Sequence, residues 1–263
     1  MRRRNRMHTR ILGVDFFSGT LEQALASIEH GGLIVVPAAP ALKNLTHDRM
    51  YREALLGADL AITDSAFMVM VWNFLQGDDL QRLSGLKYQR QLLQQESFRR
   101  PGNTVWVMAG KHSAGRNLDY LASLGITVPE ECIYMAPMYG EQVEDTDLRD
   151  LIDQQRPNHV VITIGGGSQE KLGYYLKQHL SYLPAIHCTG AAIAFLSGDQ
   201  VHIPGWADKF YMGWLVRSLS DPMQFIPRYW EARKLLQLIV RYRERLPATI
   251  EESSAIPTSI TIG

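Results

Sequence analysis

Cysteine is scarce in this sequence. Only Cys132 and Cys188 occur among its 263 residues, and no CxxC pair or His/Cys spacing suited to a metal accompanies them. Two thiols in a chain of this size are typical of a reducing compartment rather than of a disulfide-bonded secreted domain. We therefore expect a cytoplasmic protein with no disulfide and no zinc site.

Long apolar runs and familiar catalytic motifs are also missing. No uncharged apolar stretch reaches about 18 residues, so no transmembrane helix is expected. The start MRRRNRMHTR is basic, but no apolar segment follows it, so we expect no secretory signal. The chain has no HExxH, no GxSxG, no Walker loop and no GxGxxG turn. These absences disfavour zinc hydrolases, serine hydrolases and dinucleotide-dependent oxidoreductases.

Net charge is absent as well, because 27 basic residues balance 27 acidic ones. The two signs are nevertheless separated along the chain. Residues 1–10 hold five arginines and no acid, residues 11–205 hold 14 basic and 21 acidic residues, and residues 206–245 hold 8 and 4. A neutral total gives no reason to expect nucleic-acid binding. The separation predicts an acidic core with two basic ends.

Strand-length apolar runs alternate with segments of helical periodicity. The runs are continuous rather than alternating, which is typical of a parallel sheet covered by helices on both faces. We therefore predict an α/β fold: an α/β/α sandwich with a mainly parallel, Rossmann-like sheet and a C-terminal helical appendage. The expected strands lie at 11–15, 33–37, 58–63, 104–110, 132–137, 159–167 and 185–188.

Composition divides the chain into four segments. We expect a basic N-terminal arm at 1–10, an α/β catalytic domain at 11–200, a helical appendage at 201–245 and a flexible tail at 246–263. The appendage has no strand-like run and is rich in aromatic and basic residues. It favours either an anionic membrane surface or an anionic ligand, while a packed hairpin with a solvated basic face is the plain structural alternative.

Ligands of open parallel sheets bind at the carboxyl ends of the strands. This rule predicts one rim that contains three candidate substrate-binding glycines, Gly110, Gly166 and Gly190. The complete rim is Pro37–Pro40, Asp64–Ser65, Gly110–Lys111, Pro137–Gly140, Gly165–Gln169 and Thr189–Gly190.

Asp64 stands where a predicted strand ends and an apolar helix begins. Its carboxylate can cap that helix, or it can face the rim as a general base. Both interpretations remain open from position alone, and the capping one is slightly favoured.

A glycine-rich turn, Gly165–Gly167, precedes Ser168, Gln169 and Glu170 at a predicted helix start. Bare N–H groups at a helix N-terminus suit a phosphate or a carboxylate. A tight strand-to-helix turn without a ligand explains the same letters equally well. The turn at Gly110–Lys111 has the same two interpretations.

Asp145-Thr146-Asp147 matches in letters the DxD motif of metal-dependent sugar-nucleotide enzymes. No apolar strand feeds it, and Thr146 suits a helix cap, so we expect no metal site here.

Together, the ordered motifs resemble the WecG/TagA/CpsF glycosyltransferase family over roughly residues 11–232. The resemblance rests on ADLAITDS with its apolar helix, QRLSGLK, VWVMAGK, GGGSQEK, TGAAIAFLSG and PGWADKFYMGWLVRSLSDPMQFIPRYW. The last of these is the most specific.

The resemblance implies an inverting glycosyltransferase that needs neither metal nor other cofactor. Its donor would be a UDP-sugar, and its acceptor an undecaprenyl-diphosphate-linked sugar at the cytoplasmic face of the bacterial plasma membrane. The product would serve exopolysaccharide, capsule or teichoic-acid-like biosynthesis. Residues 206–245 would contact the anionic membrane surface, and homo-oligomerisation stays open.

The resemblance also implies roles for individual residues. The catalytic base falls on Asp64, and a second catalytic position falls on Arg82. Gln169 and Glu170 would bind substrate. The arginines that hold the UDP diphosphate fall on Arg217 and Arg228.

Several positions depart from the family pattern. The usual Thr-x-Asn-Pro is here Pro37-Ala38-Ala39-Pro40, and the usual Asp of a Gly-Gly-x-Phe-Asp run is Ile193. A glycine is replaced by Ser65, an aspartate by Lys87 and an arginine by Gln224. These losses favour a changed sugar, such as a hexose in place of an N-acetylhexosamine, as in a xanthan-type glucosyltransferase. They also motivate the alternative of an inactive scaffold in a membrane polysaccharide-assembly complex.

Overall fold

The computed structural model describes residues 7–199, 223 and 233–249. Within them the chain forms one eight-stranded sheet in the order β1-β2-β4-β3-β8-β7-β5-β6. Only β1 and β2 pair antiparallel; every other pair is parallel. The mainly parallel α/β fold is thus confirmed. The strands are β1 His8–Ile11, β2 Val14–Phe17, β3 Gly32–Val35, β4 Leu60–Ile62, β5 Thr104–Met108, β6 Ile133–Met135, β7 His159–Ile162 and β8 Ala185–Cys188.

The first strand prediction, 11–15, is wrong in detail. The chain turns back at Leu12 and Gly13, which have φ angles of 53° and 80°, and so makes a β1–β2 hairpin. Two successive positive φ angles give a turn whose twist matches that of the flanking strands. The sequence hid this turn because leucine rarely adopts such a conformation.

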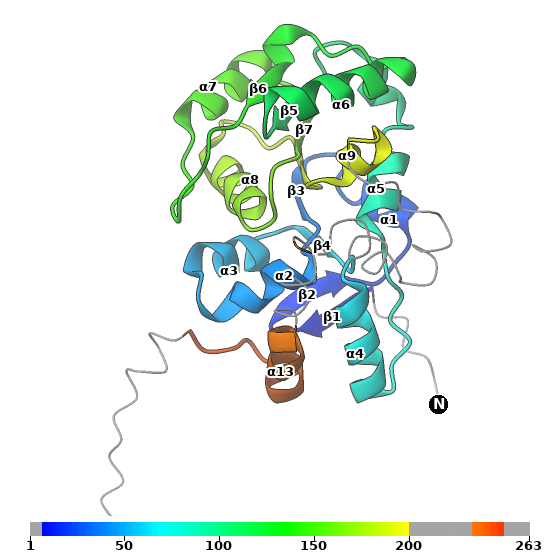
Figure 1. Ribbon diagram of the computed structural model, residues 1–263, viewed down its shortest axis with the longest axis vertical. Helices are drawn as coiled ribbons and strands as arrows, with labels where there is room; N and C mark the ends of the chain where they lie inside the picture. The colour runs from blue at the N-terminus through cyan, green and yellow to red at the C-terminus, as the bar shows by residue number, and fades with distance from the viewer. Residues whose placement is uncertain (1–6, 200–222, 224–232, 250–263) are drawn as a thin grey trace, which may run out of the picture.

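Helices cover both faces of the sheet. Figure 1 shows α2, α3, α7 and α8 on one side and α1, α5, α6 and α9 on the other. Each side has its own cluster of buried apolar side chains, so the sheet lies between two cores. The helices are α1 Leu21–Ala26, α2 Ala39–Leu42, α3 Arg49–Leu56, α4 Ala66–Gln76, α5 Gly85–Leu92, α6 Lys111–Ser123, α7 Thr146–Gln155, α8 Ser168–His179, α9 Ala192–Leu196 and α13 Arg233–Tyr242, with short 3₁₀ turns at Lys43–Thr46, Glu96–Arg99 and Glu130–Cys132.

Two of these helices have an aspartate carboxylate as their N-terminal cap. Asp48 accepts the N–H of Tyr51 at the start of α3, and Asp145 accepts that of Leu148 at the start of α7, both at 2.9 Å. Thr146 is therefore the first residue of α7 and not its cap. Helix α6 begins at Lys111, without a side-chain cap, and the hydroxyl of Ser113 within its first turn donates to Asp199 at 2.6 Å.

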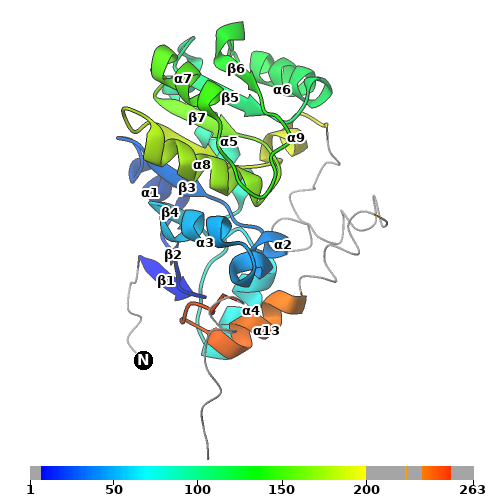
Figure 2. The ribbon, with the colours of Figure 1, turned by 90° about the vertical axis from the view of Figure 1, so that its left-hand side faces the viewer.

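The C-terminal helix α13 packs beside α4, against the β1–β2 end of the molecule (Figure 2). Beyond α13 the carbonyl oxygens of Arg243 and Glu244 accept the N–H groups of Leu12 and Gly13, at 2.7 and 3.0 Å. A side chain on Gly13 would meet Leu246 at 2.6 Å. The hairpin turn therefore serves as a dock for the chain after α13. Among the described residues, no helix is both long and apolar enough to cross a membrane.

Candidate active site

The predicted rim exists as one edge of the sheet. Because β3, β4, β5, β6, β7 and β8 all run parallel, the segments that follow them emerge on the same side. Asp64 follows β4, Gly190 follows β8, Gly166 follows β7 and Gly110 follows β5. At the usual strand spacing of about 4.8 Å, Gly190 and Gly166 stand about two and three strands from Asp64, and Gly110 about four.

Asp64 is anchored through one of its two carboxylate oxygens. Its Oδ1 accepts the backbone N–H of Gly85 at 2.9 Å and a hydrogen bond from Nη2 of Arg82 at 3.1 Å. The described residues place no hydrogen bond on Oδ2. The side chain is about a quarter exposed, at 25%. One oxygen therefore holds the group in place while the other remains available.

Arg82 donates two hydrogen bonds to Asp64. Its Nε donates to the carbonyl oxygen of Asp64 at 2.6 Å, in addition to the contact with Oδ1. The Arg82 side chain is 15% exposed, so this ion pair is partly shielded from water. The structure thus brings Asp64 and Arg82 together, while their catalytic roles stay predictions.

The capping interpretation of Asp64 is wrong for the helix that follows it. Ser65 is the cap of α4, and its hydroxyl accepts the N–H of Met68 at 3.2 Å. Asp64 instead binds the first N–H of α5, twenty-one residues later. At that helix start the side chain of Ser84 makes no capping hydrogen bond, so the carboxylate of Asp64 takes the place of a cap.

Two further residues hold this contact, Thr63 and Gly85, which the sequence placed in the ADLAITDS and QRLSGLK motifs without a role of their own. The Thr63 hydroxyl donates to the carbonyl of Gln81 at 2.9 Å and accepts the N–H of Leu83 at 3.0 Å. It thereby ties the end of β4 to the segment that leads into α5. A side chain on Gly85 would begin 2.6 Å from Cγ1 of Val36, so only glycine allows α5 to approach β3 and β4 this closely.

The glycine-rich turn carries its own carboxylate. Oε2 of Glu170 accepts the N–H of Gly167 at 2.6 Å, and Oε1 accepts Nε2 of Gln169 at 3.0 Å. Glu170 is completely buried, and this burial raises the pKa of its carboxyl group to about 7. Gly167 has a φ of +97°, so glycine is needed to make the turn. The side chains of Gln169 and Glu170 thus lie at the turn, and their predicted role in substrate binding stays a prediction.

Gly190, the third glycine of the predicted rim, lies against the side chain of Gln169. A side chain on Gly190 would begin 3.3 Å from Oε1 of Gln169 and 3.4 Å from its Nε2. Gln169 is 3% exposed, and its Oε1 has no hydrogen-bond partner among the described residues. The absence of a side chain at Gly190 leaves room for this amide at the rim.

The other predicted site positions are Gly110 with its neighbour Lys111 and the residues of the C-terminal appendage. Gly110 is the residue before α6, and a side chain there would meet nothing within 4 Å, while Lys111 is exposed. Arg217 and Arg228, the two predicted diphosphate ligands, lie outside the described residues, as does Gln224.

Asp145 is used structurally. Besides the N–H of Leu148 it accepts the hydroxyl groups of Tyr134, at 2.8 Å, and of Tyr139. Burial, followed by these bonds to Asp145, raises the pKa of both tyrosines. Within the described part of the chain, no three His, Cys, Asp or Glu side chains come together as a metal site.

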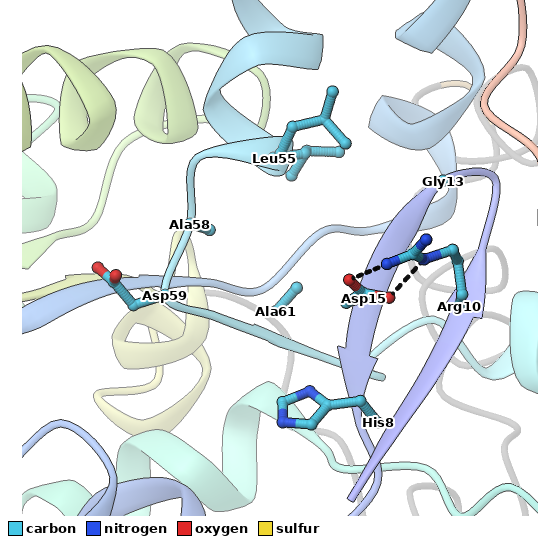
Figure 3. Close-up of a pocket in the computed structure, with 9 residues that line it drawn as sticks. His8, Arg10, Gly13, Asp15, Leu55, Ala58, Asp59 and Ala61 are labelled. Carbon is cyan, nitrogen blue, oxygen red and sulfur yellow. Dashed lines mark hydrogen bonds and ion pairs between the residues drawn. The ribbon is translucent and has the colours of Figure 1, made fainter. Parts of the chain in front are cut away.

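A surface hollow of about 640 Å³ lies away from this rim. It is lined by His8, Arg10, Asp15 and Asp59 together with residues at the end of α3 (Figure 3). His8 and Arg10 lie in β1, Asp15 lies in β2 and Asp59 precedes β4, so the hollow lies along the β1–β2 side of the sheet and contains none of the rim residues. Arg10 is paired twice with Asp15 at 2.7 Å, and Asp59 lies 2.7 Å from Nζ of Lys177. Its charges are thus neutralised internally, and we take the rim as the candidate site.

Comparison with known families gives one match. A profile described as "Glycosyl transferase WecG/TagA/CpsF family" matches residues 9–249, a range that contains Asp64, Arg82 and the glycine-rich turn. Comparison with curated proteins finds no significant match.

Proposed function

Because this chain belongs to the Glycosyl transferase WecG/TagA/CpsF family, we propose that it transfers a sugar from a UDP-sugar to an undecaprenyl-diphosphate-linked sugar. Family membership makes it a glycosyltransferase of bacterial polysaccharide or teichoic-acid synthesis. The donor, the lipid acceptor, inversion at the anomeric carbon and independence of metal are the proposal.

The arrangement of Asp64 supports this proposal most directly. A general base must be fixed in place and must still present an oxygen to the group that it deprotonates. Arg82 and the N–H of Gly85 fix Oδ1, and Oδ2 has no hydrogen bond within the described residues. The residue stands at the carboxyl edge of a parallel sheet, where ligands of such folds bind.

The proposed step is a single displacement. Oδ2 of Asp64 takes the proton from a hydroxyl group of the acceptor sugar, and that oxygen forms a bond to C1 of the donor sugar. The bond between C1 and the β-phosphate oxygen breaks on the opposite face, so the configuration at C1 inverts. The electron pair leaves with UDP. Cationic groups lower the barrier by neutralising the charge that develops on the diphosphate, and we assign this role to Arg217 and Arg228.

The proposed identity of the sugar rests on positions where the family pattern has polar groups and this chain has none. Ile193, where the family pattern has an aspartate, is completely buried in α9 within the core on the α1, α5, α6 and α9 side. The segment Pro37–Pro40 carries no polar side chain and leads into α2. We propose a hexose as the donor sugar, as in a xanthan-type glucosyltransferase, with an N-acetylhexosamine as the alternative.

Part of the proposed membrane-contacting surface lies within the described residues. Helices α4 and α13 lie side by side and expose Met70, Phe74, Leu236 and Val240. Helix α13 has no acidic residue and exposes Arg233, Lys234 and Arg241. Apolar and basic side chains on one surface suit the interface of an anionic bilayer. We therefore propose peripheral association with the inner face of the plasma membrane.

The test is transfer of radiolabelled sugar from a panel of UDP-sugars to a polyprenyl-diphosphate sugar. We expect product from the wild-type chain and none from Asp64→Asn, which keeps the shape of the side chain and loses the base. Wild-type activity in Asp64→Asn would remove Asp64 from the reaction. No transfer by the wild type with any donor would instead favour the inactive scaffold.

A further inference from the structure

Glu170 is the carboxylate that the mechanism above does not use, although it lies inside the candidate site. It is completely buried, at the start of α8, and both of its oxygens are hydrogen-bonded. Its partners are the backbone N–H of Gly167 and the side-chain amide of Gln169. A buried carboxylate with such partners demands an explanation, because burial of a charge is costly.

The first consequence concerns the kind of ligand that the glycine-rich turn can accept. A helix N-terminus with bare N–H groups suits an anion, and here Glu170 itself supplies that anion. A diphosphate placed at the same turn would face a negative charge at short range. The turn is therefore better suited to a neutral part of a ligand.

The second consequence concerns the orientation of Gln169. An ionised Glu170 has no hydrogen to donate, so Gln169 must turn its NH₂ group toward Oε1. Its carbonyl oxygen then points the other way, and this Oε1 is buried with no hydrogen-bond partner in the part of the chain that the structure describes. The point where a side chain on Gly190 would begin lies 3.3 Å from this Oε1, 3.4 Å from Nε2 of Gln169 and 3.5 Å from the carbonyl oxygen of Ile164. Two hydrogen-bond acceptors, Oε1 of Gln169 and the Ile164 carbonyl, thus lie beside Gly190.

We infer that Glu170 is a positioning residue, which fills the anion position of the glycine-rich turn and turns the carbonyl of Gln169 toward a hydroxyl group of the bound sugar. This inference rests on the proposed function for the identity of the ligand. The orientation of the amide does not depend on it.

The charged and titratable neighbours of Glu170 keep their protonation state near neutral pH, whereas Glu170 itself changes it. On α8, Lys171 reaches away from it to Asp48, the cap of α3, at 3.0 Å. Tyr51 on α3 and Cys188 on β8 have raised pKa values because both are buried and both face Glu170. They remain neutral where Glu170 titrates. A protonated Glu170 can donate to Gln169, and this permits the reversed amide that presents NH₂ in place of the carbonyl.

The orientation is tested by NMR of the Gln169 side-chain amide, assigned through the loss of its signal in Gln169→Glu. We expect this signal to shift with pH, with a midpoint near 7, in the wild type. It should show no such titration in Glu170→Gln. Glu22→Gln, which changes an exposed first-turn carboxylate of α1 that is bonded to Gln91, is the matched control and should titrate like the wild type. A flat signal in the wild type, or the same titration in Glu170→Gln, would overturn the inference.

The ligand is tested separately. Addition of inorganic diphosphate should leave the backbone amide signals of Gly166 and Gly167 unchanged, and a saturable shift would show that the turn is a phosphate site after all. In calorimetry, Glu170→Gln should weaken UDP-sugar binding roughly five- to tenfold, the effect of one neutral hydrogen bond, and leave UDP binding unchanged. Equal losses for both ligands would contradict the assignment. A wild-type chain that binds no UDP-sugar would contradict the proposed function and the sugar hydroxyl together, while the amide titration would still decide the role of Glu170.

Discussion

The carboxylate of Asp64 accepts the backbone N–H of Gly85 at 2.9 Å, across twenty-one residues of sequence. This bond joins the end of β4 to the start of α5, and Arg82, three residues before Gly85, closes the same loop onto Asp64. The candidate base, its cationic partner and a helix N-terminus thus form one unit. Changes in any of the three are expected to affect the reaction.

Substitution of Gly85 tests the close approach of α5. In Gly85→Ala the new Cβ would meet Cγ1 of Val36 at 2.6 Å, and the stiff valine side chain has little room to move. We expect α5 to shift away from Asp64, with a loss of activity of on the order of 10²-fold and a loss of about 1–3 kcal/mol in the free energy of unfolding. Initial rates and denaturant unfolding measure the two effects.

Gly115→Ala is the control for this substitution. Gly115 lies inside α6, and a side chain there meets nothing within 4 Å, so alanine should stabilise the helix slightly and leave the activity unchanged. If Gly85→Ala behaved in the same way, the approach of α5 to Val36 would not matter for Asp64.

Arg82 tests the geometry of the ion pair. Arg82→Lys keeps the positive charge but cannot donate from two nitrogens to both the backbone and the carboxylate of Asp64. We expect kcat to fall by tenfold or more with a smaller change in KM, since the substitution misplaces the base. Arg49→Lys, at an exposed pair with Glu53 on α3, should leave both constants unchanged. A selective rise in KM would indicate instead that Arg82 binds substrate.

Glu170 and His159 are expected to give the stability of the protein two opposing dependences on pH. The folded chain raises the pKa of Glu170 from 4.5 to about 7, so it holds a proton that the unfolded chain has lost. The stabilising contribution of this group is complete below pH 4.5 and is lost as the pH rises toward 7. Burial lowers the pKa of His159 from 6.5 to about 4, so its contribution is complete above pH 6.5 and is lost as the pH falls toward 4.

Two variants separate these contributions. Each pKa shift corresponds to a change of about 3 kcal/mol in the free energy of unfolding over the pH range between the two pKa values. Relative to Glu170→Gln, the wild type should be most stable near pH 4.5 and should lose its advantage by pH 8. The free energy of unfolding of His159→Gln should decrease less than that of the wild type as the pH falls from 6.5 to 4. Urea unfolding at a series of pH values measures both, and parallel curves for all three proteins would contradict the assigned pKa shifts.

The sequence predicted the rim well because the rule behind it is topological. Strands that read as buried and parallel place their carboxyl ends at one edge, so Asp64, Gly166 and Gly190 could be assigned to that edge without any contact being known. Long-range pairings were not accessible in the same way. Nothing near Gly85 indicates that its N–H binds a carboxylate from another strand, because that contact depends on how α5 packs on Val36.

The interior of the sheet gives a second example. The hydroxyl of Tyr88 lies 2.8 Å from Nδ1 of His187, whose Nε2 lies 3.2 Å from Nδ1 of His159, and Nε2 of His159 lies 3.0 Å from the hydroxyl of Ser97. This chain of hydrogen bonds crosses from α5 over β8 and β7 to a 3₁₀ turn. Its four residues are scattered along the sequence, so periodicity and motif spacing carry no signal of it.

Membrane contact through α4 is the last prediction. Phe74 is 86% exposed and Met70 is 48% exposed on the same face of α4, one helical turn apart. Removal of an apolar side chain of this size from a bilayer interface should cost about 1.5–3 kcal/mol, so Met70→Ser with Phe74→Ser should weaken binding to vesicles that contain phosphatidylglycerol by tenfold or more. Flotation at low and high salt measures this and also reports the electrostatic share contributed by α13.

Met138→Ser is the matched control, because Met138 is 98% exposed and follows β6, the edge strand opposite β1 in the sheet, whereas α4 lies at the β1–β2 end (Figure 1). It removes a methionine that is even more exposed than Met70, so it should leave flotation unchanged if the effect depends on the surface formed by α4 and α13. Equal binding by the Met70/Phe74 variant and the wild type would show that α4 does not enter the bilayer and would leave the basic residues as the source of any association. Because α4 begins two residues after Asp64, an inserted α4 would also set the distance between the candidate base and the headgroup region, where the diphosphate of the proposed lipid acceptor would lie.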